Sequence, residues 1–221
     1  MNVALVLASL WLAFAATHMT FSSVTLRPKL VAALGERAFQ GLYSLIALAI
    51  FVPLVWVYFA NKHAGPHLFH LGGLPGMRLL VYAIMGTAFA LLVAGTVRPS
   101  PASVAPGKGE PAGALRVTRH PVLMAIGLFG VAHLLAASIN LADLVFFAGF
   151  LIFALIGCRH QDVRKLASGD EKFRRFHAST VFLPFSAPGA LPAALREDAI
   201  PIAIGIGAAF VVRYFHPQLF S

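Results

Sequence analysis

Long runs of apolar residues without any charge dominate the chain. Residues 1–26, 38–61 and 79–97 contain no Asp, Glu, Lys or Arg, and residues 121–158 contain only Asp143. A helix rises about 1.5 Å per residue and needs roughly 20 apolar residues to cross a bilayer. The first three runs therefore predict one membrane-spanning helix each, and the fourth is long enough for a hairpin of two helices.

Polar residues mark the turn of this hairpin and the end of the last span. We expect the turn near Asn140–Asp143, where the carboxylate of Asp143 can cap the second helix. A final apolar run, 199–212, is short, and Arg213 can reach past its end to water. The pattern predicts an all-α polytopic membrane bundle of about six transmembrane helices, formed by a single domain, 1–221.

Composition supports a membrane protein rather than a soluble one. Of the 221 residues, 59% are hydrophobic and 11% are charged, whereas a soluble domain carries about 25% charged residues. The formal net charge of +9 therefore indicates membrane topology and contact with anionic lipids, and not binding to nucleic acid. One cysteine, Cys158, excludes a disulfide framework and a multi-cysteine metal site, and its apolar surroundings predict a packed thiol.

The distribution of basic residues assigns a side of the membrane to each loop. The loops after the first, third and fifth helices hold 14 of the 17 Lys and Arg residues. The positive-inside rule places these loops in the cytoplasm and both termini outside it. The fourteen are Arg27, Lys29, Arg37, Arg98, Lys108, Arg116, Arg119, Arg159, Arg164, Lys165, Lys172, Arg174, Arg175 and Arg196. The other side keeps Lys62, Arg78 and Arg213.

Two of the predicted cytoplasmic loops have distinct compositions. Residues 99–113 are rich in Pro and Gly, which predicts a flexible connector without a helix. Residues 161–177 form an amphipathic stretch with mixed charges, and the apolar segment 181–185 follows. We expect there a helix on the cytoplasmic face that packs back on the bundle.

Two histidines lie inside the uncharged runs. His18 falls late in the first span, and His133 lies well inside the hairpin. Each can be a histidine that is hydrogen-bonded to a neighbouring helix. Two neutral imidazoles on different helices of one bundle are also what a low-spin haem needs as axial ligands, and they suit a transition metal. Because the sequence has no CxxCH motif, such a haem would be b-type.

Depth in the membrane constrains how these histidines can pair. His18 lies toward the cytoplasmic end of its helix and His133 toward the opposite end, which separates them by ~15 Å if neither helix is tilted. A haem between two histidines needs their Cα atoms only ~12–13 Å apart, as bond lengths indicate. His120, near the cytoplasmic edge, matches His18 better in depth and is the alternative second ligand.

The sequence Arg119-His120-Pro121 opens the hairpin. Pro121 suits the first turn of a helix, where its missing N–H costs nothing. Arg119 and His120 then sit at a helix N-terminus, which favours anions and phosphates. A helix cap with a topology-setting arginine is the simpler explanation of the same residues.

Other histidines and absent motifs narrow the chemistry further. The spacing of His63, His67 and His70 suits zinc, but Gly65 and Pro66 interrupt any helix that would align them, so we expect a solvated loop. No phosphate-binding glycine loop, serine nucleophile elbow or HExxH motif occurs, and we expect no buried pair of carboxylates. Three histidines that flank helices are also expected to be solvated: His160, His177 and His216.

Several motifs taken together resemble the NnrU family of membrane proteins. They are Leu34-Gly35-Glu36-Arg37-Ala38-Phe39 with Leu42-Tyr43-Ser44-Leu45-Ile46, His18 with Ser22-Ser23, Arg116-Val117-Thr118-Arg119-His120-Pro121, and Ala132-His133-Leu134. The resemblance covers roughly the whole chain and implies a single NnrU-like domain in a bacterial inner (cytoplasmic) membrane. The family is associated with denitrification through nitrite and nitric oxide reductases, which implies a respiratory nitrogen-oxide reductase as a partner.

The chain also resembles the NnrU-like domain of the plant 15-cis-zeta-carotene isomerase. That domain binds haem b through two histidines, at positions that match His18 and His133 here. The resemblance implies these two side chains as axial ligands of haem b, Arg119 as the partner of a propionate, and a lipophilic small molecule as substrate. We weight it above the depth estimate, because helix tilt and boundary shifts of a few residues can absorb the difference.

A more distant resemblance is to the isoprenylcysteine carboxyl methyltransferases. They share the Arg119-His120-Pro121 opening, the hairpin and a following charged segment that ends in Pro184-Phe185. In that group the segment binds S-adenosylmethionine and a glutamate follows the hairpin, whereas residues 159–164 contain Asp162 and no glutamate. The alternative hypothesis is therefore methyl transfer to a lipophilic or thiol substrate. A third hypothesis is a non-catalytic assembly factor for a respiratory reductase.

Overall fold

The computed structural model describes residues 2–103, 107, 109–136 and 138–220, and its long elements are all helices. Two short strands also occur, β1 (His67–His70) and β2 (Ser138–Asn140), and they pair antiparallel. In chain order the helices are α1 (Val3–Phe21), α2 (Leu26–Leu34), α3 (Glu36–Ala60), α4 (Met77–Val97), α5 (Ala114–Val117), α6 (Pro121–Ala136), α7 (Leu141–Ala167), α8 (Glu171–Ser179), α9 (Ala190–Glu197) and α10 (Ala199–Phe220).

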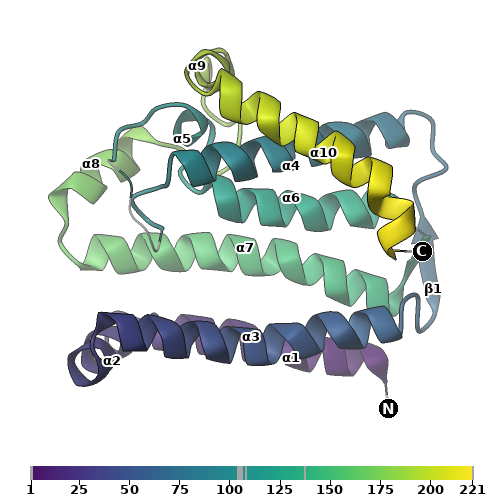
Figure 1. Cartoon of the computed structure of the whole chain (residues 1–221), viewed down its shortest axis with the longest axis horizontal. Coiled ribbons are helices and arrows are strands. Elements are labelled where there is room, and N and C mark those ends of the chain that lie inside the picture. The colour runs from purple at the N-terminus through teal and green to yellow at the C-terminus, as the bar shows by residue number, and fades with distance from the viewer. Residues whose placement is uncertain (1, 104–106, 108, 137, 221) are drawn as a thin grey trace.

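The all-α polytopic membrane bundle predicted from the sequence is confirmed. Among the described residues, α1, α3, α4, α7 and α10 are long and apolar enough to cross a membrane. The sixth apolar helix, α6, has 16 residues, or ~24 Å of rise. It packs between α4 and α7, and both termini lie at the same end of the bundle, as expected for six antiparallel segments (Figure 1).

α7 lies at the centre of the bundle (Figure 1). α1 and α3 pack on one part of its surface, α6 packs on another, and α4 and α10 continue the layer beyond α6. Glycines allow the helices to approach closely. A Cβ on Gly130 would overlap the carbonyl oxygen of Phe147, and a Cβ on Gly149 would overlap the indole of Trp11. That indole donates a hydrogen bond to the carbonyl oxygen of Phe146 at 3.2 Å.

Asp143 closes the hairpin turn, as the sequence predicts. Its Oδ2 atom accepts from the backbone N–H of Asn140 at 2.9 Å, which caps α7. The other oxygen, Oδ1, accepts from the hydroxyl of Tyr58 on α3 at 3.0 Å. The Nδ1 atom of His63 lies 3.0 Å from Oδ2. Because the Asp143 side chain is 1% exposed, these contacts compensate its burial and tie α3 to α7.

Several predicted boundaries differ from the structure. α7 continues past the expected end at residue 158 to Ala167, so residues 161–167 belong to a membrane helix and not to a separate surface helix. The surface helix is the shorter α8, which begins after Gly169 (φ 75°) and the N-cap Asp170. Polar residues extend a membrane helix into water without breaking it, so hydropathy underestimates its length.

Three further segments depart from the predicted pattern. The segment predicted as the first cytoplasmic loop contains α2, and α10 extends well beyond residue 212. The outer loop contains β1, which pairs with β2 beside the hairpin turn. Residues 99–113 form no helix at their described positions, as predicted, and Lys108 lies outside the described residues.

A second buried carboxylate, Asp198, anchors the start of α10. Its side chain is 2% exposed and accepts from Arg98 Nη2 at 2.9 Å and from the backbone N–H of Ala114 at 2.7 Å. Its neighbour Glu197 accepts from Arg116 at 2.9 Å, and this hydrogen bond lowers the pKa of Glu197. These contacts fasten α9 and α10 to the segment that precedes α6.

Gly113 is the most constrained position of this anchor. It adopts φ 56°, and a Cβ there would overlap the carboxylate of Asp198. We predict that Gly113→Ala lowers the free energy of unfolding of the detergent-purified protein by about 3 kcal/mol, as measured by thermal unfolding. The change adds backbone strain and displaces the buried, paired carboxylate of Asp198. Gly189→Ala is the matched control, since Gly189 has φ 72° and open space around its Cβ position. Equal losses in the two variants would contradict the role assigned to Asp198.

Candidate functional site

His18 lies near the end of α1 among aromatic rings. Its ring centroid is 4.1 Å from that of Phe14, 5.0 Å from that of Tyr43 and 5.3 Å from that of Phe153. Its Nδ1 atom lies 2.9 Å from the carbonyl oxygen of Phe14, one helical turn earlier. An oxygen acceptor requires that Nδ1 carry the proton, so Nε2 keeps its lone pair.

His133, on α6, is held in the same way. Its Nδ1 atom lies 2.8 Å from the carbonyl oxygen of Phe129, again one turn earlier. The imidazole stacks on the ring of Phe147 at 4.7 Å and lies 4.2 Å from the ring of Phe129. Histidines that bind metals usually donate the N–H of their other ring nitrogen to a carbonyl or carboxylate, which fixes the tautomer and the ring orientation. Both histidines meet this requirement.

The two imidazoles pack against different aromatic residues of α7. The α7 residues beside them, Phe153 and Phe147, are six positions apart, or ~9 Å along the helix axis. Between them lies Phe150, whose ring is 5.0 Å from that of Trp11 and 5.2 Å from that of Phe129. The structure thus retains the offset in depth that the sequence indicates, although α1 and α6 both pack on α7.

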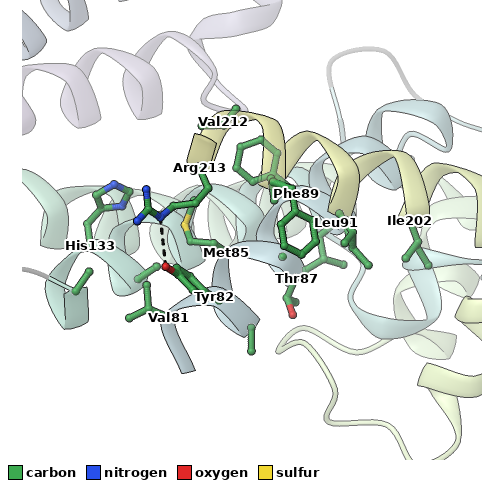
Figure 2. A pocket seen from close by; sticks show the side chains of 18 of the residues that line it. Val81, Tyr82, Met85, Thr87, Phe89, Leu91, His133, Ile202, Val212 and Arg213 are labelled. Carbon is green, nitrogen blue, oxygen red and sulfur yellow. Dashed lines mark hydrogen bonds between the residues drawn. The ribbon is translucent and has the colours of Figure 1, made fainter. Parts of the chain in front are cut away.

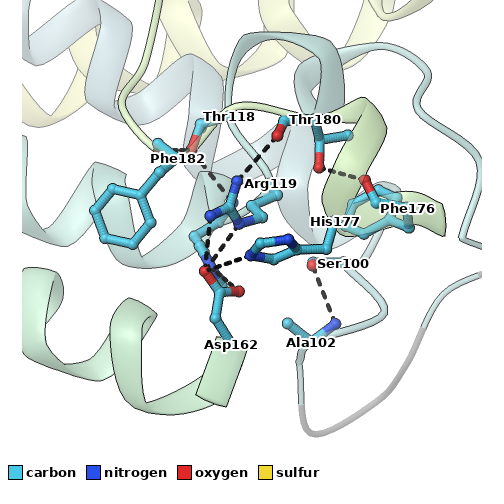
Figure 3. A network of polar contacts seen from close by, with 10 residues as sticks. Ser100, Ala102, Thr118, Arg119, Asp162, Phe176, His177, Thr180 and Phe182 are labelled. Carbon is cyan, nitrogen blue, oxygen red and sulfur yellow. Dashed lines mark hydrogen bonds and ion pairs between the residues drawn. The ribbon is translucent and has the colours of Figure 1, made fainter. Parts of the chain in front are cut away.

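Arg119 and His120 lie in a different place, at the opposite end of α6 from His133. Figure 3 shows the side chain of Arg119 directed at Asp162. The guanidinium of Arg119 donates from Nε to Asp162 Oδ2 at 2.9 Å and from Nη1 to the carbonyl oxygen of Thr180 at 2.9 Å. Nε2 of His120 lies 2.9 Å from the other oxygen, Oδ1. The Asp162 side chain is 0% exposed, and those of Arg119 and His120 are 10% and 1% exposed.

The segment after α8 closes over this cluster, as predicted for residues 181–185. The backbone N–H of Arg119 donates to the carbonyl oxygen of Val181 at 2.9 Å, and the hydroxyl of Thr118 donates to that of Phe182 at 2.7 Å. The ring of Phe182 lies 5.4 Å from the guanidinium carbon of Arg119. His177 also reaches the cluster, with Nε2 3.6 Å from Asp162 Oδ2, and burial lowers the pKa of this imidazole.

Both oxygens of the Asp162 carboxylate have basic partners, and Arg119 also donates to the carbonyl oxygen of Thr180. The buried Nε2 atom of His177, in contrast, has no hydrogen-bond partner among the described residues. Arg119, His120 and Asp162 line neither of two cavities in the described part of the chain, one bordered by His133 and the other by His160. The arrangement therefore joins α6, α7 and the segment after α8. The sequence analysis missed the role of Asp162, whose only signal is a lone carboxylate one helical turn after Cys158. Cys158 itself is a buried thiol, as predicted.

The expectation that three flanking histidines are solvated is wrong. His160, His177 and His216 are each partly buried, because α7 and α10 are longer than predicted and α8 packs on the bundle. His160 Nε2 lies 2.8 Å from the hydroxyl of Ser22, and the ring of His216 lies 6.3 Å from that of His133. His63, His67 and His70 are exposed, as predicted, although His67 and His70 lie in β1 and not in a loop.

His133 also borders a large groove between α4, α6 and α10, with a volume of about 1450 Å³ (Figure 2). Most of its lining is apolar. One end is basic and aromatic, with Arg78, Tyr82, Arg213 and His216. His133 thus lies between the aromatic core around α7 and this groove.

Comparison with known proteins identifies the family. The family model of the NnrU protein matches residues 6–221. The 15-cis-zeta-carotene isomerase, chloroplastic, of Arabidopsis thaliana is 29% identical over 187 residues, which cover 80% of this chain and 48% of the isomerase. The chain thus spans about half the length of that relative. No solved structure matches the chain. A family match over nearly the whole length of this apolar helical bundle shows that the chain is a multi-pass membrane protein of the NnrU family.

Proposed function

We propose that this NnrU protein binds haem b, with His18 and His133 as axial ligands. The observation that carries the proposal is that the two imidazoles are oriented by the same kind of hydrogen bond. Each has Nδ1 within 2.9 Å of the carbonyl oxygen one turn earlier, and each therefore keeps the Nε2 lone pair for a metal. Distant similarity to 15-cis-zeta-carotene isomerase supports the same assignment.

The chemistry of the donors and of their surroundings fits haem b. Two neutral imidazoles are the ligands of a low-spin haem, and aromatic side chains provide the apolar lining that a porphyrin needs. Phe129 contacts His133 and Phe153 contacts His18, and both rings, like that of Phe150, are only partly buried. When bound, the haem supplies an iron that changes oxidation state.

The Asp162 cluster has a positioning role in this proposal. It holds the first turn of α6 against α7 and the segment after α8. The length of α6 between His120 and His133 then sets the depth of the second imidazole. Arg119, expected to pair with a haem propionate, has Asp162 as its partner, and Nε2 of His120 is directed at the same carboxylate.

The family and its relative suggest two roles for such a haem in a bacterial inner membrane. One is support of denitrification, through the expression or activity of a nitrite or nitric oxide reductase. The other is haem-dependent isomerisation of a lipophilic substrate, in line with the name of the Arabidopsis relative. Methyl transfer is less well supported, because Arg119 and His120 line neither described cavity.

We predict that His18→Ala and His133→Ala each abolish the spectrum of a six-coordinate haem b. The measurement is the absorption spectrum of the detergent-purified protein, first oxidised and then reduced with dithionite. On reduction, the Soret band of the parent protein should shift and sharp α and β bands should be present. His67→Ala, at an exposed position in β1, is the control and should leave the spectrum unchanged. Retention of the parent spectrum by both variants would rule out this ligand pair. Loss of the haem spectrum in a folded His120→Ala variant would favour His120 as an axial ligand instead.

Asp162→Ala should destabilise the bundle strongly, by about 3–5 kcal/mol, because it leaves Arg119 and His120 buried without their partner. Thermal unfolding followed by size-exclusion chromatography measures the change. The control is Asp170→Ala, which removes an exposed N-cap at α8 and should cost about 1 kcal/mol. If Asp162 only positions α6, the fraction of the variant that remains folded keeps the haem spectrum. A folded protein without haem would instead make the cluster part of the haem site.

A further inference from the structure

Two arginines at one end of the groove between α4, α6 and α10 share a single neutral partner. Arg78 Nε donates to the hydroxyl oxygen of Tyr82 at 3.0 Å, and Arg213 Nε reaches the same oxygen at 3.4 Å. Figure 2 shows the side chain of Arg213 directed at Tyr82. Two guanidinium groups thus converge on one phenol, which offsets neither positive charge.

No carboxylate of the described chain is placed to neutralise this pair. Asp143, at the same end of the bundle, is already occupied by Tyr58, His63 and the N–H of Asn140. The other seven acidic residues lie at the opposite end, in or beside the loops that carry most of the basic residues. Arg78 also stands in the first turn of α4, where the helix dipole is positive and no acidic residue occurs. The positive electrostatic potential around Arg78 and Arg213 therefore favours the binding of an anion from outside the chain.

The rest of the groove is suited to a long apolar chain. Its lining along α4 runs from Met77 at the basic end to Ala94 near the other, a distance of ~26 Å. That distance is close to the ~30 Å thickness of the hydrocarbon core. The volume of about 1450 Å³ exceeds the ~300–1000 Å³ of typical small-molecule pockets. An acyl chain of one leaflet spans only about half of the hydrocarbon thickness, so the groove is long enough to hold one, and its cationic site lies at one membrane surface.

We propose that this groove binds an anionic phospholipid, with its phosphate between Arg78 and Arg213 and its acyl chain along α4 and α10. Guanidinium groups bind phosphate with paired hydrogen bonds, and the surrounding bilayer supplies the ligand at high concentration. The two guanidinium groups disfavour a zwitterionic head group, whose ammonium would enter the same positive field. The proposal does not depend on haem.

The test compares phosphatidylglycerol with phosphatidylcholine on the full chain. Native mass spectrometry of the detergent-purified protein titrated with each lipid should show preferential retention of phosphatidylglycerol. The double variant Arg78→Gln with Arg213→Gln should weaken that retention by roughly tenfold or more for two lost charges. Lys62→Gln is the control for loss of one positive charge, because Lys62 lies on the same side of the membrane and outside the groove. Equal retention of the two lipids, or undiminished phosphatidylglycerol binding by the double variant, would overturn the proposal.

A second pair of variants tests the apolar part of the site. Gly86 lines the groove, and a side chain there would enter open space, so Gly86→Phe should obstruct the groove without a clash in the bundle. Gly207→Phe is the control, since Gly207 also has open space around its Cβ position but lies outside the lining of the groove. Loss of phosphatidylglycerol in the first variant alone supports the site. If Gly86→Phe and Gly207→Phe bind phosphatidylglycerol equally well, the lipid binds elsewhere.

Discussion

A carboxylate buried in an apolar bundle is stable only when basic groups or hydrogen-bond donors surround it, and this constraint fixes the ends of the helices here. Three such carboxylates occur among the described residues, Asp143, Asp162 and Asp198, each at most 2% exposed. Asp143 joins α7 to α3, and Asp162 joins α7 to the start of α6 and to α8. Asp198 joins α10 to the segment before α6. The apolar middle of the helices is held instead by close packing at small residues and by the hydrogen bond from Trp11 to the carbonyl oxygen of Phe146.

The spans could be predicted because membrane insertion leaves a local signal in the sequence. An uncharged run of about 20 residues is sufficient for it, and a lone Asp143 between two such runs marks a turn and a cap. The limits of α7 could not be predicted in this way. Once the helix enters water, charged residues such as Arg164 and Lys165 continue it, and only Gly169 and Asp170 end it. The partners of Asp162 and Asp198 depend on tertiary packing, for which the sequence offers no pattern.

The candidate site could likewise be predicted only in part from the sequence. The sequence identified His18 and His133 because an ionisable side chain in a membrane helix requires a specific reason. Each follows a phenylalanine by four residues, and the carbonyl oxygen of that residue is the one that orients the imidazole. That contact is local and follows from the geometry of a helix. What the sequence could not indicate is that Phe150 packs against Trp11 and Phe129, or that Arg119 and His120 are both engaged by Asp162.

His133 belongs to both halves of the bundle, and this affects how its variants are interpreted. One side of the bundle is the aromatic core around α7, and the other is the groove between α4, α6 and α10. The imidazole stacks on Phe147 in the core and also lines the groove near Arg213. His18, in contrast, contacts only aromatic rings of α1, α3 and α7 among its described ring neighbours. A change common to the two histidine variants therefore reports on the core, whereas a change confined to His133 reports on the groove.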